Sequence, residues 1–119
     1  MLNDEQISRL LDIANAGCHK GLVSEARAIY DGVLTLKPGH VPALIGQAFS
    51  HIVIGEFSQA DEGLRTILSE NPDDADAKAM LGLSLFLEGK KEEAREVLES
   101  IGDGKGSSAL AASLLEQLA

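Results

Sequence analysis

Aromatic residues, cysteine and proline are all scarce in this chain of 119 residues. Phe, Tyr and Trp together make up 3% of the sequence, Trp is absent, and there are three prolines and a single cysteine, Cys18. The lack of aromatics disfavours a β-sandwich, and one cysteine cannot form an intramolecular disulfide. The composition therefore favours an all-α protein, and the length predicts a single domain over residues 1–119.

Positive charge and long apolar runs are also lacking. The chain has ten Lys and Arg residues and nineteen Asp and Glu residues, which gives a net charge of −9. Nucleic acid and anionic membrane surfaces would be repelled, and the apolar runs are far shorter than the ~20 residues that span a bilayer. We expect a protein partner, no nucleic acid and no membrane insertion. The first residues do not resemble a signal peptide, so the expected compartment is the cytoplasm.

A regular internal period is the main positive feature of the sequence. The residues that recur at this fixed spacing are mostly small: Gly21, Gly55 and Gly89; Ala26, Ala60 and Ala94; Ala14, Ala48 and Gly82; and Pro38 and Pro72. The period predicts repeats at about 7–40, 41–74 and 75–106, followed by a capping helix at about 107–118.

Each repeat is expected to be a pair of antiparallel helices. The glycines at 21, 55 and 89 suit the left-handed conformation that ends a first helix, and the prolines close the second helix. Ser24 and Ser58 follow two of these glycines, where we expect N-caps. Small residues at the recurring Ala positions let the two helices of a hairpin approach closely.

The repeat resembles the tetratricopeptide pattern W-x2-L-G-x2-Y, then A-x3-F, then P. The A-x3-F part is kept as Ala26-x3-Tyr30, Ala60-x3-Leu64 and Ala94-x3-Leu98, and the L-G part as Ile13-Ala14, Gln47-Ala48 and Leu81-Gly82. The Trp position differs, as Leu10, Leu44 and Lys78, and so does the Tyr position, as Gly17, His51 and Leu85. The resemblance implies a right-handed α-solenoid of three such hairpins closed by the C-terminal helix.

In this family peptides usually bind a concave surface lined by the first helix of each hairpin. The resemblance therefore implies a partner-binding surface, which here is strongly apolar and comprises Leu11, Asn15, Ile45, Phe49, Ile52, Val53, Leu83, Phe86 and Leu87. Such a surface suits an amphipathic helix or a hydrophobic segment of a partner. Two alternatives stay open: the chain's own termini could cover these residues, or the surface could be a homodimer interface of a structural, self-associating module.

Small size, acidity and an apolar groove are similar to the tetratricopeptide chaperones of type III secretion, which keep secreted subunits monomeric. The resemblance implies a chaperone or adaptor. Enzymatic motifs are missing, and the spacing of Cys18 relative to the three histidines fits no zinc motif. The segment Gly102–Gly106 is interpreted as a linker to the cap. No catalytic residue, metal or cofactor is expected.

Overall fold

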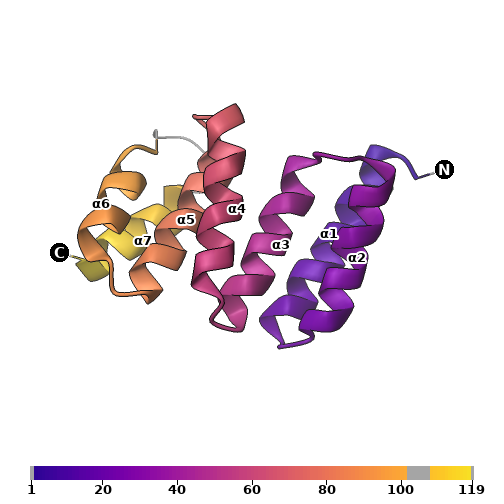
Figure 1. The fold of residues 1–119 in the computed structure, drawn as a ribbon, viewed down its shortest axis with the longest axis horizontal. Coiled ribbons are helices and arrows are strands. Elements are labelled where there is room, and N and C mark those ends of the chain that lie inside the picture. The colour runs from indigo at the N-terminus through magenta and orange to yellow at the C-terminus, as the bar shows by residue number, and fades with distance from the viewer. Residues whose placement is uncertain (1, 102–107, 119) are drawn as a thin grey trace. The chain divides into compact units, whose positions relative to one another are not determined.

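The computed structural model describes residues 2–101 and 108–118, and every regular element within these residues is an α-helix (Figure 1). The helices are α1 (Asp4–His19), α2 (Val23–Leu36), α3 (Val41–Val53), α4 (Phe57–Glu70), α5 (Ala75–Leu87), α6 (Lys91–Glu99) and α7 (Ser108–Leu118). The predicted all-α fold is confirmed. The predicted linker at 102–106 lies outside the described residues. Of the helices described, none is both long and apolar enough to cross a bilayer.

The chain divides into two compact units, Met1–Glu56 and Phe57–Ala119. The first contains α1, α2 and α3, and the second contains α4 to α7. The division falls between the two helices of the second predicted repeat, 41–74. The superhelical arrangement and the repeat bounds therefore stay predictions.

Tyr30 is central to the N-terminal unit, where α1, α2 and α3 pack against one another. Its side chain is fully buried, and its hydroxyl donates a hydrogen bond to Asn15 Oδ1 at 2.5 Å. The rest of this core is apolar, apart from the Cys18 thiol, and consists of Ile7, Leu11, Ala14, Cys18, Ala26, Val33 and Ala43. The helix α1 starts with a capping box. The Asn3 side chain accepts a hydrogen bond from the backbone N–H of Gln6, and the Gln6 side chain accepts one from the backbone N–H of Asn3.

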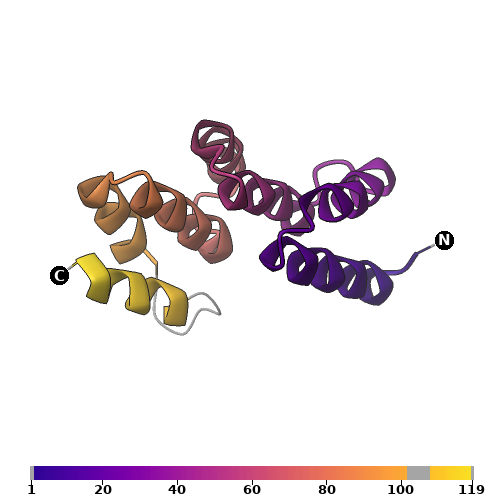
Figure 2. The same cartoon turned by 90° about the horizontal axis from the view of Figure 1, so that it is seen from below.

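In the C-terminal unit α5 packs against α4 and α6, and α7 lies against both α5 and α6 (Figure 2). Gly82 permits the close approach of α5 and α6, because a Cβ at this position would overlap the side chain of Leu98. Buried Ala111, Leu114 and Leu118 show that α7 covers part of this unit. The predicted capping helix is thus present, although Ser107 lies outside the described residues.

The turns follow the prediction at the glycines and differ from it at the serines. Gly21, Gly55 and Gly89 have φ angles of 85°, 80° and 86°, in the region that glycine adopts without strain. The N-cap prediction for Ser24 and Ser58 is wrong. Because α2 begins at Val23 and α4 at Phe57, both serines lie inside the first turn of their helices. Only one residue separates each of these glycines from the start of the next helix. The serine that follows therefore lies inside the helix and cannot cap it.

Candidate partner-binding surface

In the N-terminal unit, the residues predicted to bind a partner differ widely in exposure. Val53, the last residue of α3, is 38% exposed, whereas Asn15, Ile45 and Phe49 are partly buried. The Phe49 ring packs against the core and makes an edge contact with His19, with the ring centroids 4.8 Å apart. Leu11 and Ile52 are buried, with exposures of 6% and 5%. These two side chains stabilise the unit and have little area left for a partner.

In the C-terminal unit the predicted residues all lie on α5. Leu87, its last residue, is 50% exposed, and Leu83 and Phe86 are partly buried. Leu87 occupies the same position in its repeat that Val53 occupies in the preceding repeat. A large apolar side chain is therefore exposed at the end of α3 and again at the end of α5.

Sequence reasoning missed several other exposed apolar side chains. Ile54 is 49% exposed directly after Val53, and Ile13 is 61% exposed on α1. Leu22, Leu36 and Leu110 are exposed by 40% to 48%. Ile13 belongs to the L-G motif of the repeat, and nothing in that motif says whether another helix covers it. A hydrophobic residue on the first hairpin is covered only if some element packs on its outer side, which the repeat pattern alone does not specify.

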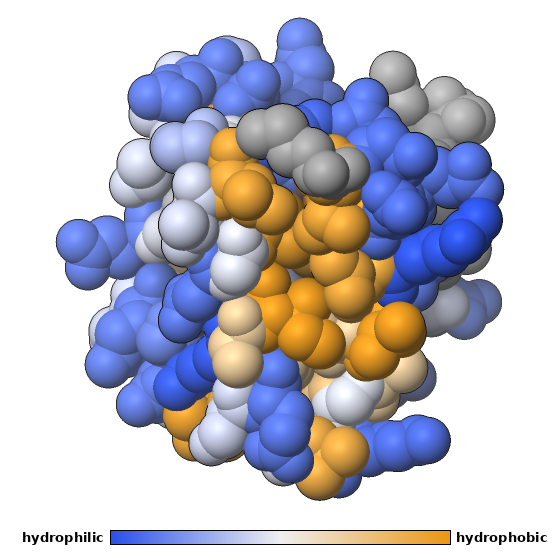
Figure 3. All heavy atoms as spheres, turned by 90° about the vertical axis from the view of Figure 1, so that its right-hand side faces the viewer, coloured by the Kyte–Doolittle hydropathy of each residue, from blue (hydrophilic) through white to orange (hydrophobic). Residues whose placement is uncertain are grey.

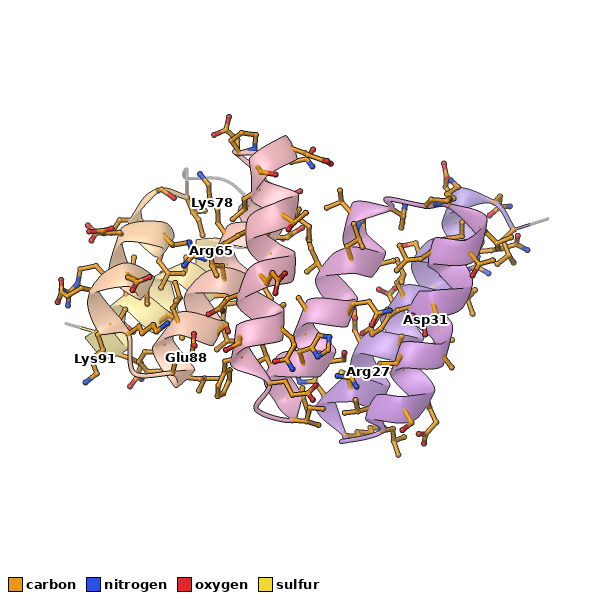
Figure 4. All side chains as sticks on the ribbon, in the orientation of Figure 1. Arg27, Asp31, Arg65, Lys78, Glu88 and Lys91 are labelled. Carbon is orange, nitrogen blue, oxygen red and sulfur yellow. The ribbon has the colours of Figure 1, made fainter. Side chains whose placement is uncertain are left out.

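A polar cluster joins α2 to α3 within the N-terminal unit. Arg27, labelled in Figure 4, reaches from α2 to α3, where its Nε donates to Ser50 Oγ at 2.9 Å. Arg27 Nη2 lies 3.0 Å from His51 Nδ1 and 3.1 Å from Glu56 Oε1. The hydrogen bonds from His51 and then from Arg27 lower the pKa of Glu56. The cluster satisfies the buried Ser50 hydroxyl and fixes α3 on α2.

At the equivalent positions of the C-terminal unit, an acidic residue stands in the place of Arg27. Asp61 and Ser84 occupy the repeat positions of Arg27 and Ser50, and Asp61 lies beside Glu88, which directly follows α5 and is labelled in Figure 4. Asp61 Oδ1, Glu88 Oε2 and Ser84 Oγ are buried without a hydrogen-bond partner in the described part of the chain. Burial, followed by the nearby Asp61 carboxyl, raises the pKa of Glu88, although Lys90 Nζ lies 3.7 Å from Glu88 Oε1. We therefore expect this acidic pair to weaken the packing of α4 on α5 at neutral pH.

The environment of Cys18 does not suit a role as a nucleophile. Cys18 is fully buried, and burial raises the pKa of its thiol, so the nucleophilic thiolate is disfavoured. Within residues 2–101 and 108–118, no three His, Cys, Asp or Glu side chains lie close enough together to hold a metal ion. The distinctive groups on the described surface are therefore apolar side chains.

The geometry described above, in which paired helices are joined at a left-handed glycine once per repeat, agrees with a family comparison. A family model described as the tetratricopeptide repeat matches residues 20–83 and again residues 55–118. The chain belongs to the tetratricopeptide repeat family. As a tetratricopeptide repeat protein it is a protein-interaction module. No curated protein matches its sequence.

Solved structures of similar fold come from several sources. The TPR domain of Sgt2 from Aspergillus fumigatus is 22% identical, with a TM-score of 0.76 over 98% of this chain and 78% of that one. The type III secretion translocator chaperone SycD from Yersinia enterocolitica is 14% identical, with a TM-score of 0.73 over 99% of this chain and 84% of that one. MamA from Desulfovibrio magneticus is 22% identical, with a TM-score of 0.60 over 93% of this chain and 57% of that one. At these identities the likeness establishes the fold alone.

Proposed function

We propose that this tetratricopeptide repeat protein is a chaperone or adaptor that binds an amphipathic helix or hydrophobic segment of a partner protein. The observation that carries the proposal is the exposure of Val53 and Leu87 at equivalent positions of successive repeats. Large apolar side chains exposed at a repeated surface position lower the solubility of a protein. Their presence therefore favours a role in binding. The partly buried Phe49 and Phe86 nearby add aromatic contact area, which is the kind that dominates interface energies.

The charge of the protein suggests what flanks the apolar segment in the partner. The sequence from Phe57 to Ala119 contains thirteen acidic and six basic residues, and the sequence from Met1 to Glu56 contains six acidic and four basic residues. An acidic surface attracts basic segments and accelerates their association. We therefore expect a client with an amphipathic segment whose polar side is basic.

A narrower assignment is a cytoplasmic chaperone of a type III secretion subunit. It is supported by the small acidic chain and by the similarity of its fold to SycD, which is itself a translocator chaperone. A subunit that polymerises through an amphipathic helix would be kept monomeric if that helix were occupied by the chaperone. The assignment depends on finding such a client.

Native mass spectrometry of the protein purified at endogenous level tests the proposal and identifies the client. We expect one chain bound to a small, helix-rich polypeptide. Val53→Glu and Leu87→Glu should each weaken this complex at least ~10-fold, because each places a charge where an apolar contact is expected. Leu110→Glu is the matched control, since Leu110 is an exposed leucine on α7 outside the proposed surface. Normal binding by both variants would show that the client binds elsewhere.

A further inference from the structure

The outer side of the first hairpin, the side of α1 and α2 that faces away from α3, is apolar. The inner side of α2 is identified by Arg27 and Asp31, which bond to Ser50 and Gln47 of α3. Two residues turn a helix by about 200°, so Ile29 points away from the side shared by Arg27 and Asp31. We define the outer face as Leu10, Ile13, Leu22, Ile29 and Leu36.

The members of the outer face form two adjoining rows. Ile29 and Leu36 lie about two turns apart on one side of α2, and Leu22 directly precedes the helix. Ile29 also packs against the core of the unit, so its side chain is shared between the core and the outer face. Leu10 and Ile13 lie one turn apart on α1, and Gly17 continues their row. A Cβ at Gly17 would lie 3.8 Å from Leu22 Cβ, so the two rows meet at this end of the hairpin.

Three of the five residues of this face are exposed, although it resembles a helix-packing surface, and Leu10 and Ile29 are partly buried. Ile13, Leu22 and Leu36 are 61%, 48% and 47% exposed, and Figure 3 shows an apolar area on the side of the molecule where α1 and α2 lie. The last hairpin, α5 and α6, has α7 packed against it. Terminal repeats need such a covering element to stay soluble, and within the described residues none packs on the outer face.

The charged residues beside the outer face are arranged so that the face complements itself. Lys20 lies at the end of the row on α1, where Arg9 is already paired with Glu5 of the same helix, and Glu25 flanks the row on α2. A twofold axis parallel to the helices would lay α1 of one copy against α2 of another, in antiparallel orientation. Because Lys20 directly follows α1 and Glu25 lies in the first turn of α2, Lys20 would then face Glu25 of the second copy, twice per dimer.

Net charge also favours this end of the chain for self-association. The N-terminal unit has a net charge of −2, and residues 57–119 have a net charge of −7. Two copies that meet through their first hairpins bring the less acidic unit together, so like-charge repulsion is smallest there. We propose that the outer face is the interface of a twofold homodimer, separate from the surface proposed to bind a client.

The size of the outer face predicts a weak dimer. A helix of the length of α2 is about 21 Å long, and two packed helices lie about 8–10 Å apart, so the face measures roughly 20 by 20 Å. This area is about half of the ~800 Å² per partner that stable complexes bury. A dissociation constant in the range of about 1–100 µM is therefore expected.

Sedimentation velocity of the full chain from about 2 to 300 µM tests the interface. We expect the wild type to change from monomer to dimer in this range, and Ile13→Glu and Leu36→Glu to raise the dissociation constant at least ~10-fold. Both side chains are about half exposed, so these variants should keep their helicity by circular dichroism. Leu110→Glu and Val53→Glu are matched controls on other surfaces and should dimerise normally.

Charge reversal separates specific pairing from general hydrophobic association. Lys20→Glu alone should weaken the dimer, and the double variant Lys20→Glu with Glu25→Lys should restore it, because the pair is reversed in both copies. A wild type that stays monomeric at the highest concentration would overturn the proposal. So would a dimer that is lost on Val53→Glu and kept by Ile13→Glu, since the client surface would then be the interface. Loss of a client protein on Ile13→Glu, with a monomeric wild type, would assign the face to a different partner.

Discussion

Gly46→Ala is expected to destabilise the N-terminal unit, although alanine is the better helix former. Gly46 lies within α3 against the ring of Tyr30. A Cβ at this position would lie 2.6 Å from Tyr30 Cζ, 2.7 Å from Cδ1 and closer still to Cε1. The ring cannot move aside easily, because Tyr30 is fully buried and its hydroxyl is bonded to Asn15.

The net effect is the difference between two opposing contributions. Replacing a glycine by alanine inside a helix stabilises by roughly 0.5–1 kcal/mol. Overpacking a filled core costs about 1–3 kcal/mol, and overlap with three ring atoms favours the upper part of that range. We expect the free energy of unfolding to fall by about 1–2 kcal/mol, which lowers Tm by roughly 4–10 °C.

Tyrosine fluorescence during urea unfolding is the appropriate assay. Tyr30 is the only tyrosine and the chain has no tryptophan, so the signal reports on the N-terminal unit alone. Gly32→Ala in α2 and Gly63→Ala in α4 are matched controls, because a Cβ at either glycine meets no atom within 4 Å. Gly63→Ala is followed by circular dichroism, since α4 lies in the C-terminal unit. Both controls should be slightly stabilising. If Gly46→Ala were as stable as these controls, the close packing of α3 on Tyr30 would be refuted.

Three further predictions concern single side chains. Glu88→Gln should raise Tm at pH 7 by about 2–6 °C, because an amide can donate to Asp61 where the carboxylate cannot. Since the pKa of Glu88 is raised above its ordinary 4.5, wild-type stability should decrease as the pH rises through this raised pKa, and thermal scans from pH 4 to 8 should show a smaller decrease for the variant. Asn3→Ala should cost ~1 kcal/mol in chemical unfolding by removing the capping box, and an unchanged midpoint would contradict that role. Cys18 should react with a thiol reagent only as the N-terminal unit unfolds, because it is buried and the pKa of its thiol is raised, so rapid labelling of the folded protein would show an open core.

Much of the fold could be predicted because the signals are local and repeated. The glycines at 21, 55 and 89 adopt the expected left-handed conformation, and the recurring alanines, such as Ala26 and Ala60, are buried as expected. The serine caps were predicted wrongly because a cap depends on the residue at which the helix starts, and Ser24 lies just past that start.

The candidate surface was less predictable, because exposure depends on elements distant in sequence. Leu11 and Ile52 match the pattern of a groove as well as Val53 does, yet both are buried within the N-terminal unit. Ile13 belongs to a structural motif of the repeat and is nevertheless the most exposed of the large hydrophobic residues described. Periodicity identifies the side of a helix on which a residue lies, but it does not show what packs on that side.

The sequence by itself determined the all-α class, the family and the spacing of the repeated positions, since helix periodicity, glycine turns and small packing residues act over short distances. Only the tertiary structure decided which apolar side chains are covered. It also decided that Arg27 meets Ser50, His51 and Glu56, and that Asp61 meets Glu88. The physical reason is that burial and charge pairing arise between helices, at contacts that residues within a single helix do not specify.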